Sequence, residues 1–174
     1  SPISAETIFF LLELANKFKV KIVIDLNWRE VFWDYSSFLS DMSKVERANL
    51  IKKFLNHAHL IKLSKEEATL FFESDNPLVI SKKLPKRPDV IITNGEKPVI
   101  WFLNMLQGTT NIPAMEKIVD TTGAGDAFLA GLVSKLISSG YPSNELEMQD
   151  CIKFASTCGL LTCLGEGAIE PQPD

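Results

Sequence analysis

Residues 119–128 read Val-Asp-Thr-Thr-Gly-Ala-Gly-Asp-Ala-Phe, a pattern that predicts the end of a strand, a glycine turn and the start of a helix. Gly123 and Gly125 allow a tight turn that brings backbone N–H groups close to an anion. Apolar residues at helical spacing follow from Ala127 to Ile137, so the positive end of a helix dipole faces the turn. We therefore expect backbone groups to hold an anion at this turn.

Asp126 stands on the first turn of the predicted helix. A carboxylate beside a phosphate would be repelled, so its presence suggests that it takes a proton while backbone groups hold the phosphate. In the alternative interpretation, Asp126 is an ordinary acidic residue at a helix N-terminus and the glycines belong to an ordinary loop. For a bare Gly-x-Gly-Asp pattern this alternative is the stronger of the two.

Composition limits the classes of function. The chain has 174 residues, 45% of them hydrophobic, which suits one domain with a real core. A net charge of −4 with scattered Lys and Arg argues against nucleic acid as a partner, and no apolar run reaches membrane-spanning length. Cys151, Cys158 and Cys163 fit no zinc spacing and indicate small buried side chains in a reducing compartment. His57 and His59 lack a third ligand nearby in the sequence.

Alternating helix and strand patterns predict an α/β protein with a mainly parallel sheet, as a single domain over residues 1–174. Strands are expected at 20–25, 58–63, 89–93 and 117–119, with an antiparallel pair at 98–103 and 108–112. Helices are expected near the start, at 43–56, after 64, at 76–84, from the glycine turn to 140, and at 145–163. The first strand should be buried on both faces, and residues 25–29 follow at its carboxyl end, where α/β sheets bind ligands.

In this strand–turn–helix context, residues 119–128 resemble the signature of the ribokinase-like (PfkB) carbohydrate kinases. Residues 25–29 with Trp33 resemble the Asp-x-Asn-x-Arg stretch of fructokinase-type members, and residues 93–97 resemble the Thr-x-Gly-Glu nucleotide turn. Residues 154–169 are similar to the last helix and the loop that borders adenine and a monovalent cation. The resemblance implies a three-layer α/β/α, Rossmann-like fold and transfer of the γ-phosphate of ATP to a sugar or nucleoside hydroxyl.

The resemblance assigns roles to the glycine turn. Asp126 would be the catalytic base that takes the proton of the attacking hydroxyl. Gly123, Ala124 and Gly125 would supply the N–H groups of an anion hole for the transferring phosphoryl group. Such preorganised donors suit phosphoryl transfer, which needs positioning and charge stabilisation more than covalent help.

The nucleotide and acceptor contacts follow from the other motifs. Thr93, Gly95 and Ser156 would line the ATP site, although Ser156 could equally be an ordinary polar residue on a buried helix. Asn27 and Arg29 would lie near the phosphates and the incoming sugar. The alternative for Arg29 is a surface ion pair.

The resemblance also implies a potassium-like cation behind the turn. Asp120 and the carbonyl of Thr122 would bind it, joined by backbone oxygens near Thr162, Gly165 and Gly167. The alternative for Asp120 is an acid at a strand end whose oxygens accept nearby N–H groups.

Magnesium is the second implied ion. Many family members carry Asn-x-x-Glu where this chain has Ser64-Lys65-Glu66-Glu67, and the Glu acts through water on Mg²⁺. Glu67 is kept and the Asn is replaced by Ser64. Because Ser-x-x-Glu is also a capping box, helix capping explains Glu67 almost as well.

The remaining expectations concern the whole protein. The chain looks like the C-terminal half of a fructokinase-like kinase, without the sugar pocket and β-sheet lid, so we expect little sugar-kinase activity from it alone. Its expected ligands are ATP and a small sugar, with no nucleic acid or membrane partner and with a homodimer through the absent lid. We also expect an intracellular location, in the cytoplasm or in a plastid. The alternatives are a non-catalytic structural or regulatory subunit and a nucleoside or sugar-acid kinase of the same fold.

Overall fold

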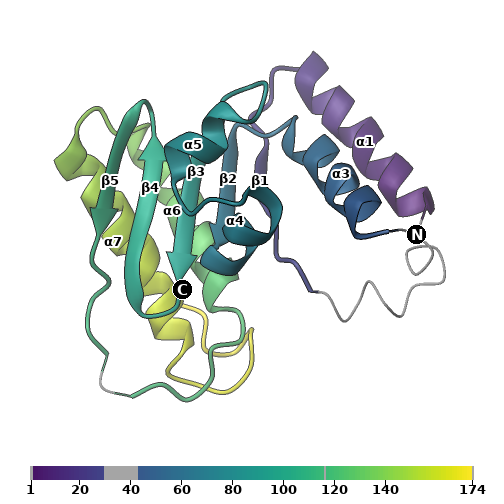
Figure 1. Cartoon of the computed structure of the whole chain (residues 1–174). Helices are drawn as coiled ribbons and strands as arrows, with labels where there is room; N and C mark the ends of the chain where they lie inside the picture. Colours follow the sequence, from purple (N-terminus) through teal and green to yellow (C-terminus); the bar gives the residue numbers. More distant parts are fainter. Residues whose placement is uncertain (1, 30–42, 116, 174) are drawn as a thin grey trace. The chain divides into compact units, whose positions relative to one another are not determined.

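The computed structural model describes residues 2–29, 43–115 and 117–173, and Trp33 lies outside them. The described helices are α1 (Pro2–Lys17), α3 (Lys44–Leu55), α4 (Lys65–Phe72), α5 (Pro77–Lys82), α6 (Ala124–Ser139) and α7 (Glu145–Thr162) (Figure 1). The strands are β1 (Val23–Asp25), β2 (Leu60–Ser64), β3 (Asp89–Asn94), β4 (Lys97–Leu103) and β5 (Leu106–Thr110), in the sheet order β1-β2-β3-β4-β5. The chain divides into two compact units, Ser1–Ile92 and Thr93–Asp174.

In the first unit, β1 runs parallel to β2, with Asp25 aligned opposite Lys62. Helices α3, α4 and α5 contribute the apolar side chains that cover one face of these strands. This core contains Ile51, Leu55, Ala58, Ile61, Leu63, Ala68, Phe71, Phe72, Ile80, Leu84, Val90 and Ile92. Since Ile61 and Leu63 alternate along β2, they share the face that the helices bury.

Both predicted capping boxes form, which confirms two helix starts in this unit. The Ser43 hydroxyl accepts the Glu46 N–H (3.3 Å), and the Glu46 carboxylate accepts the Ser43 N–H (2.8 Å). The second pair, Ser64 and Glu67, makes the same two bonds at 3.1 and 2.7 Å. Each box provides partners for N–H groups that a helix N-terminus leaves without acceptors.

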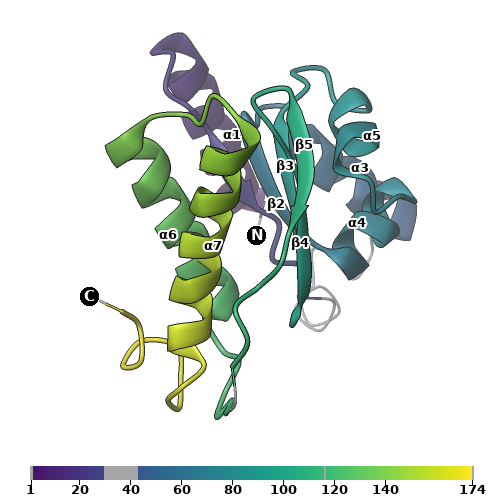
Figure 2. The same ribbon diagram turned by 90° about the vertical axis from the view of Figure 1, so that its left-hand side faces the viewer.

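In the second unit, the predicted antiparallel pair is confirmed as the hairpin β4–β5. Trp101 lies opposite Gly108 in the register and is fully buried. The indole Nε1–H donates to Thr110 Oγ1 at 2.9 Å, so the single polar group of the ring has a partner. Helix α7 packs against β5, and α6 lies alongside α7 (Figure 2).

The strand predicted at residues 117–119 does not form. This segment has no regular secondary structure, and the Val119 N–H donates to the carbonyl of Cys163 at the end of α7 (2.8 Å). The prediction that the first strand is buried on both faces is also wrong, because β1 has only three residues and Val23 is 38% exposed. Within the described residues, β1 stands first in the sheet and pairs only with β2.

Helix positions were predicted better than their buried faces. In α1, Leu12 is buried, but Ile8 and Leu11 are about half exposed, and Phe18, directly after the helix, is 66% exposed. In α6, Ile137 is 79% exposed and the buried set shifts by a position or so, to Ala127, Phe128, Gly131, Leu132 and Leu136. The close approach of α7 explains this shift, since a Cβ on Gly131 would lie 2.7 Å from Cys158 Sγ.

The cysteines behave as the sequence indicates. Cys151 and Cys163 are buried, Cys158 is half-buried, and burial raises the pKa of all three thiols. No group of three or more His, Cys, Asp or Glu side chains in the described residues could hold a metal ion. None of the helices described here combines the length and apolar character that crossing a membrane requires.

Candidate functional site

The glycine turn forms as predicted at the start of α6. Gly123 is the N-cap residue and has φ +80°, a left-handed conformation that glycine adopts without strain. Among the described residues, no side chain caps the N-terminus of the helix. The Ala124 N–H donates to the Thr121 carbonyl at 3.2 Å, whereas the N–H groups of Gly125 and Asp126 belong to the helix turn that has no intrahelical acceptors. The N–H groups of Gly125 and Asp126 are therefore the most available donors for an anion.

Asp126 lies on the first turn of α6 with its side chain exposed. Solvent can reach the carboxylate, and its place beside the N–H groups of the turn is the one that the sequence predicts. A base in this position can accept a proton from a hydroxyl that reacts with a phosphate at the helix N-terminus.

A cavity of about 440 Å³ in the second unit brings together residues from three predicted motifs. The nucleotide turn contributes Thr93 and Gly95, the glycine turn contributes Ala124 and Gly125, and α7 contributes Ser156. The cavity thus joins five candidate residues that lie as much as 63 positions apart in the sequence, from 93 to 156. Asp126 is not among the lining residues.

Sequence reasoning missed the apolar walls of this cavity. They include Val99, Ile112, Ile118, Phe128 and Leu160. Phe128 and Leu160 each lie four positions after a predicted site residue on the same helix, so helical spacing could have found them. A mainly apolar cavity with a few polar groups is the usual character of a small-molecule site.

Ser156 is the most informative residue of the cavity. It is 4% exposed, and its hydroxyl has no hydrogen-bond partner among the residues that the structure describes. A buried hydroxyl without a partner costs free energy, on the order of 1–3 kcal/mol, so such a group calls for a ligand or a water molecule. This observation favours the nucleotide-site interpretation of Ser156 over that of an ordinary buried polar residue.

Asp120 joins the glycine turn to the loop that follows α7. One carboxylate oxygen accepts the N–H and the hydroxyl of Thr122 (3.0 and 2.7 Å), and the other accepts the Gly167 N–H (2.9 Å). The hydrogen bonds from Thr122 and then Gly167 lower the pKa of Asp120. This is the arrangement expected of an acid whose oxygens accept nearby N–H groups.

The other residues of the predicted cation site lie in the same region of the second unit. Thr162 is fully buried, and its hydroxyl donates to the Cys158 carbonyl at 3.1 Å. Gly165 packs closely on Pro171, where an added Cβ would approach to 2.9 Å. The loop after α7 also covers the turn, since a Cβ on Gly123 would lie 3.0 Å from Ala168.

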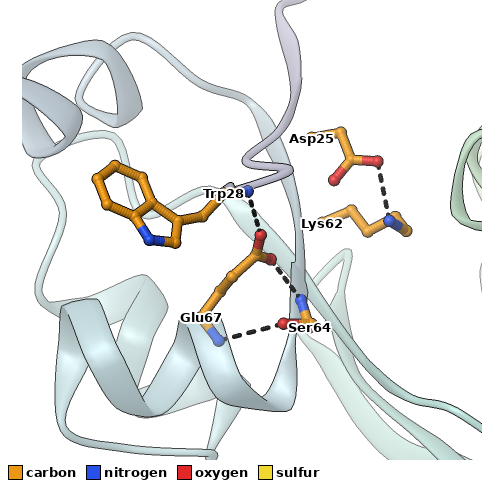
Figure 3. A network of polar contacts seen from close by, with 5 residues as sticks. All are labelled: Asp25, Trp28, Lys62, Ser64 and Glu67. Carbon is orange, nitrogen blue, oxygen red and sulfur yellow. Dashed lines mark hydrogen bonds and ion pairs between the residues drawn. The ribbon is translucent and has the colours of Figure 1, made fainter. Parts of the chain in front are cut away.

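The predicted residues of the first unit lie in segments that follow β1 and β2, and Figure 3 shows Glu67 among them. Asn27 and Arg29 are exposed in the loop after β1, and Asn27 has φ +43°. Glu67 is 8% exposed, and its two carboxylate oxygens accept the N–H groups of Trp28 (2.5 Å) and Ser64 (2.7 Å). The capping-box function of Glu67 is therefore realised.

Beside this group, Lys62 Nζ and Asp25 Oδ2 form an ion pair at 2.8 Å (Figure 3). The side chains of the two residues are 8% and 16% exposed. The pair links the end of β1 to the middle of β2, where each charged group would otherwise lie mostly buried without its partner.

The chain belongs to the pfkB family of carbohydrate kinases, because the model of that family matches residues 2–174. A fructokinase of Salmonella thompson is 30% identical, over 98% of this chain and 74% of the relative. A fructokinase of Klebsiella pneumoniae is 33% identical, over 98% of this chain and 53% of the relative. The chain thus spans only part of the length of these curated relatives.

Solved structures confirm the α/β fold of this family. A fructokinase from Xylella fastidiosa, solved with bound ATP, superimposes with a TM-score of 0.81 at 22% identity, over 97% of this chain and 53% of the other. A fructokinase from Vibrio cholerae O395, solved with fructose, ADP and calcium ion, gives a TM-score of 0.79 at 26% identity, over 97% of this chain and 52% of the other.

Proposed function

We propose that this chain is the nucleotide-binding and catalytic part of an ATP-dependent kinase that phosphorylates a sugar hydroxyl, on fructose or a related sugar. The carrying observation is the cavity of the second unit, where the unpartnered Ser156 hydroxyl, Thr93 and Gly95 share a lining with the start of α6. Fructokinase relatives with bound ATP, or with fructose and ADP, support this choice of ligands.

In this proposal, the nucleotide base binds among the apolar residues of the cavity, and Ser156 hydrogen-bonds to it. The glycine turn, Gly123 to Gly125, holds the transferring phosphoryl group through backbone N–H groups. Each fixed donor of this kind is worth about 3 kcal/mol in enzymes where it has been measured. Asp126 takes the proton of the acceptor hydroxyl, which contributes roughly 10²–10⁴ in rate.

Asn27 and Arg29 are proposed to bind the phosphates or the sugar. Both side chains are exposed at the carboxyl end of β1, as ligand-binding residues of α/β sheets are. A guanidinium group suits a phosphate because it donates two parallel hydrogen bonds.

Two ions complete the proposal. Mg²⁺ would enter with the nucleotide and neutralise charge on its phosphates. Glu67, whose carboxylate oxygens accept the N–H groups of Trp28 and Ser64, would act on it through water, as the family resemblance implies. A potassium-like ion would be held by Asp120 with the carbonyl of Thr122 and by carbonyls from 162 to 167. The bond from Gly167 to Asp120 supports this grouping, since it joins the two contributing segments.

Asp126→Asn tests the proposal in the longest natural form of the protein. We expect turnover to fall by roughly 10²–10⁴ while ATP binding stays near normal, because the amide cannot accept the proton. The matched variant Ser156→Ala should weaken ATP binding and leave the chemical step largely intact. Near-normal turnover of Asp126→Asn would show that Asp126 is not the base.

A panel of sugars, nucleosides and sugar acids, assayed by ADP release, tests the acceptor. Fructose turnover would support the proposal, and a nucleoside or sugar-acid preference would reassign the substrate within the same chemistry. ATP binding without turnover on any acceptor would favour the structural or regulatory subunit. Robust sugar phosphorylation by residues 1–174 alone would contradict the expectation that the acceptor pocket requires more chain.

A further inference from the structure

The loop after β1 is fixed to the rest of the first unit at three points. The Leu26 N–H donates to the Lys62 carbonyl at 3.3 Å, and the Trp28 N–H donates to Glu67 Oε1 at 2.5 Å. The Trp28 ring packs edge-on against Phe71 of α4, with centroids 5.1 Å apart and an interplanar angle of 77°. This short loop is thus held both by its backbone and by the side chain of Trp28.

Glu67 does more in this arrangement than cap α4. The capping box needs one of its carboxylate oxygens, which accepts the Ser64 N–H at 2.7 Å. The other oxygen accepts the N–H of Trp28, a residue 39 positions earlier in the chain. The buried carboxylate therefore bridges the loop after β1 and the start of α4 (Figure 3).

This bridge determines how Asn27 and Arg29 are presented. Asn27 lies between the fixed residues Leu26 and Trp28, with φ +43°. Non-glycine residues rarely adopt this left-handed conformation, and asparagine is among those that tolerate it best. The Asn27 side chain is exposed, and so is that of Arg29, the next residue but one. A buried anchor that holds an exposed amide and an exposed guanidinium suits recognition of an anion.

We propose that Glu67 is a positioning residue, which holds residues 26–29 so that Asn27 and Arg29 present an exposed amide and guanidinium to a phosphate-bearing ligand. This inference rests on the proposed function for the identity of the ligand. If Glu67 positions the loop, replacing it should change the conformation of residues 26–29. If Glu67 acts on the metal instead, replacing it should change how ATP binding depends on Mg²⁺.

Amide hydrogen exchange tests the bridge without any need for turnover. In Glu67→Ala, the Trp28 amide should exchange at least about tenfold faster, because a hydrogen bond to a buried carboxylate is lost. The Ser64→Ala control removes the hydroxyl of the capping box but keeps both carboxylate contacts, so it should leave Trp28 protected. If the alanine variant loses α4, Glu67→Asp replaces it, since aspartate keeps the charge but is one methylene too short for both contacts.

A double-mutant cycle then tests the positioning. ATP affinity is measured for Arg29→Ala, Glu67→Ala and the double variant, in the longest natural form and at several Mg²⁺ concentrations. We expect Arg29→Ala to weaken binding several-fold in the native background and to add little once Glu67 is replaced. Additive losses, or an unchanged Trp28 exchange rate with an altered Mg²⁺ dependence, would overturn the proposal.

The two proposals fail in different ways. A native protein that binds no ATP would refute the proposed function. The exchange rate of the Trp28 amide would still decide whether Glu67 holds the loop. If ATP binds and Glu67→Ala leaves both the exchange rate and the affinity unchanged, the positioning role alone is refuted.

Discussion

Gly159→Ala, a substitution on α7, should weaken the proposed nucleotide site by displacing the start of α6. Gly159 lies on α7 and lines the cavity, and a Cβ added there would lie 2.8 Å from the carbonyl oxygen of Ala124. That oxygen belongs to the first turn of α6, directly before Gly125, whose N–H is a candidate phosphate donor. Because the obstructing atom is backbone, the start of α6 must move by roughly a few tenths of an ångström.

The expected size of the effect follows from two opposing terms. Overpacking costs about 1–3 kcal/mol, and replacing a helical glycine by alanine returns about 1 kcal/mol. The net loss of about 0–2 kcal/mol corresponds to a fall in melting temperature of up to roughly 8 °C. Misplacing a reacting group by about 1 Å can cost roughly a hundredfold, so a shift of a few tenths should weaken ATP binding or turnover by roughly three- to tenfold.

Gly131→Ala is the matched control, because it overpacks the same two helices away from the glycine turn. Its Cβ would lie 2.7 Å from Cys158 Sγ, a side-chain atom, and Gly131 does not line the cavity. In thermal unfolding, Gly131→Ala should lower the melting temperature no more than Gly159→Ala does, because a side chain gives way more easily than backbone. Calorimetric titration with ATP should show weakened binding only for Gly159→Ala. Equal ATP affinities for the two variants would refute the argument that α7 positions the glycine turn.

Two further predictions concern stability in the first unit. The Ile22 N–H donates to His59 Nδ1 (3.0 Å), and burial, followed by two nearby lysines, lowers the pKa of His59. As the pH falls, the unfolded chain therefore binds the proton first, so stability is complete above about pH 6.5 and falls as the pH drops toward and through the folded pKa. Urea unfolding should show this loss, and His59→Gln should reduce it. Greater stability in acid would contradict the prediction. Asp25→Ala leaves the buried Lys62 ammonium without its carboxylate and should lower the free energy of unfolding by about 3 kcal/mol. The double variant Asp25→Leu/Lys62→Met should be nearly neutral, because no buried charge is left without a partner. Equal losses for the two variants in chemical denaturation would contradict this account.

Local signals explain which parts of the fold could be predicted from the sequence. The capping boxes at Ser43 and Ser64 and the hairpin over residues 97–110 depend on neighbours in the chain, and all three form. The segment 117–119 has β-branched residues that favour a strand, but its backbone bonds to the end of α7, a contact that no local pattern reveals. The buried face of α6 was misjudged for the same reason, since α7 selects it.

The residues of the candidate site also differ in whether the local sequence could reveal them. The polar residues Thr93, Gly95 and Ser156 came from motifs, and the structure gathers them in one cavity. The apolar residues Val99 and Ile112 could not be found in this way, because nothing in their local sequence distinguishes a cavity wall from ordinary core. The contact between Glu67 and Trp28 was also out of reach, because it crosses 39 positions.

The pairing of Trp101 with Gly108 restricts how the hairpin can fold. A Cβ at position 108 would lie 2.5 Å from the indole ring, so no residue with a side chain fits opposite Trp101. Gly108 is the one glycine in β5, and a slip of one residue would bring Gln107 or Thr109 against the ring and turn every other side chain to the wrong face. Misaligned hairpins are therefore penalised at this buried contact, and the glycine at position 108 helps to fix one register.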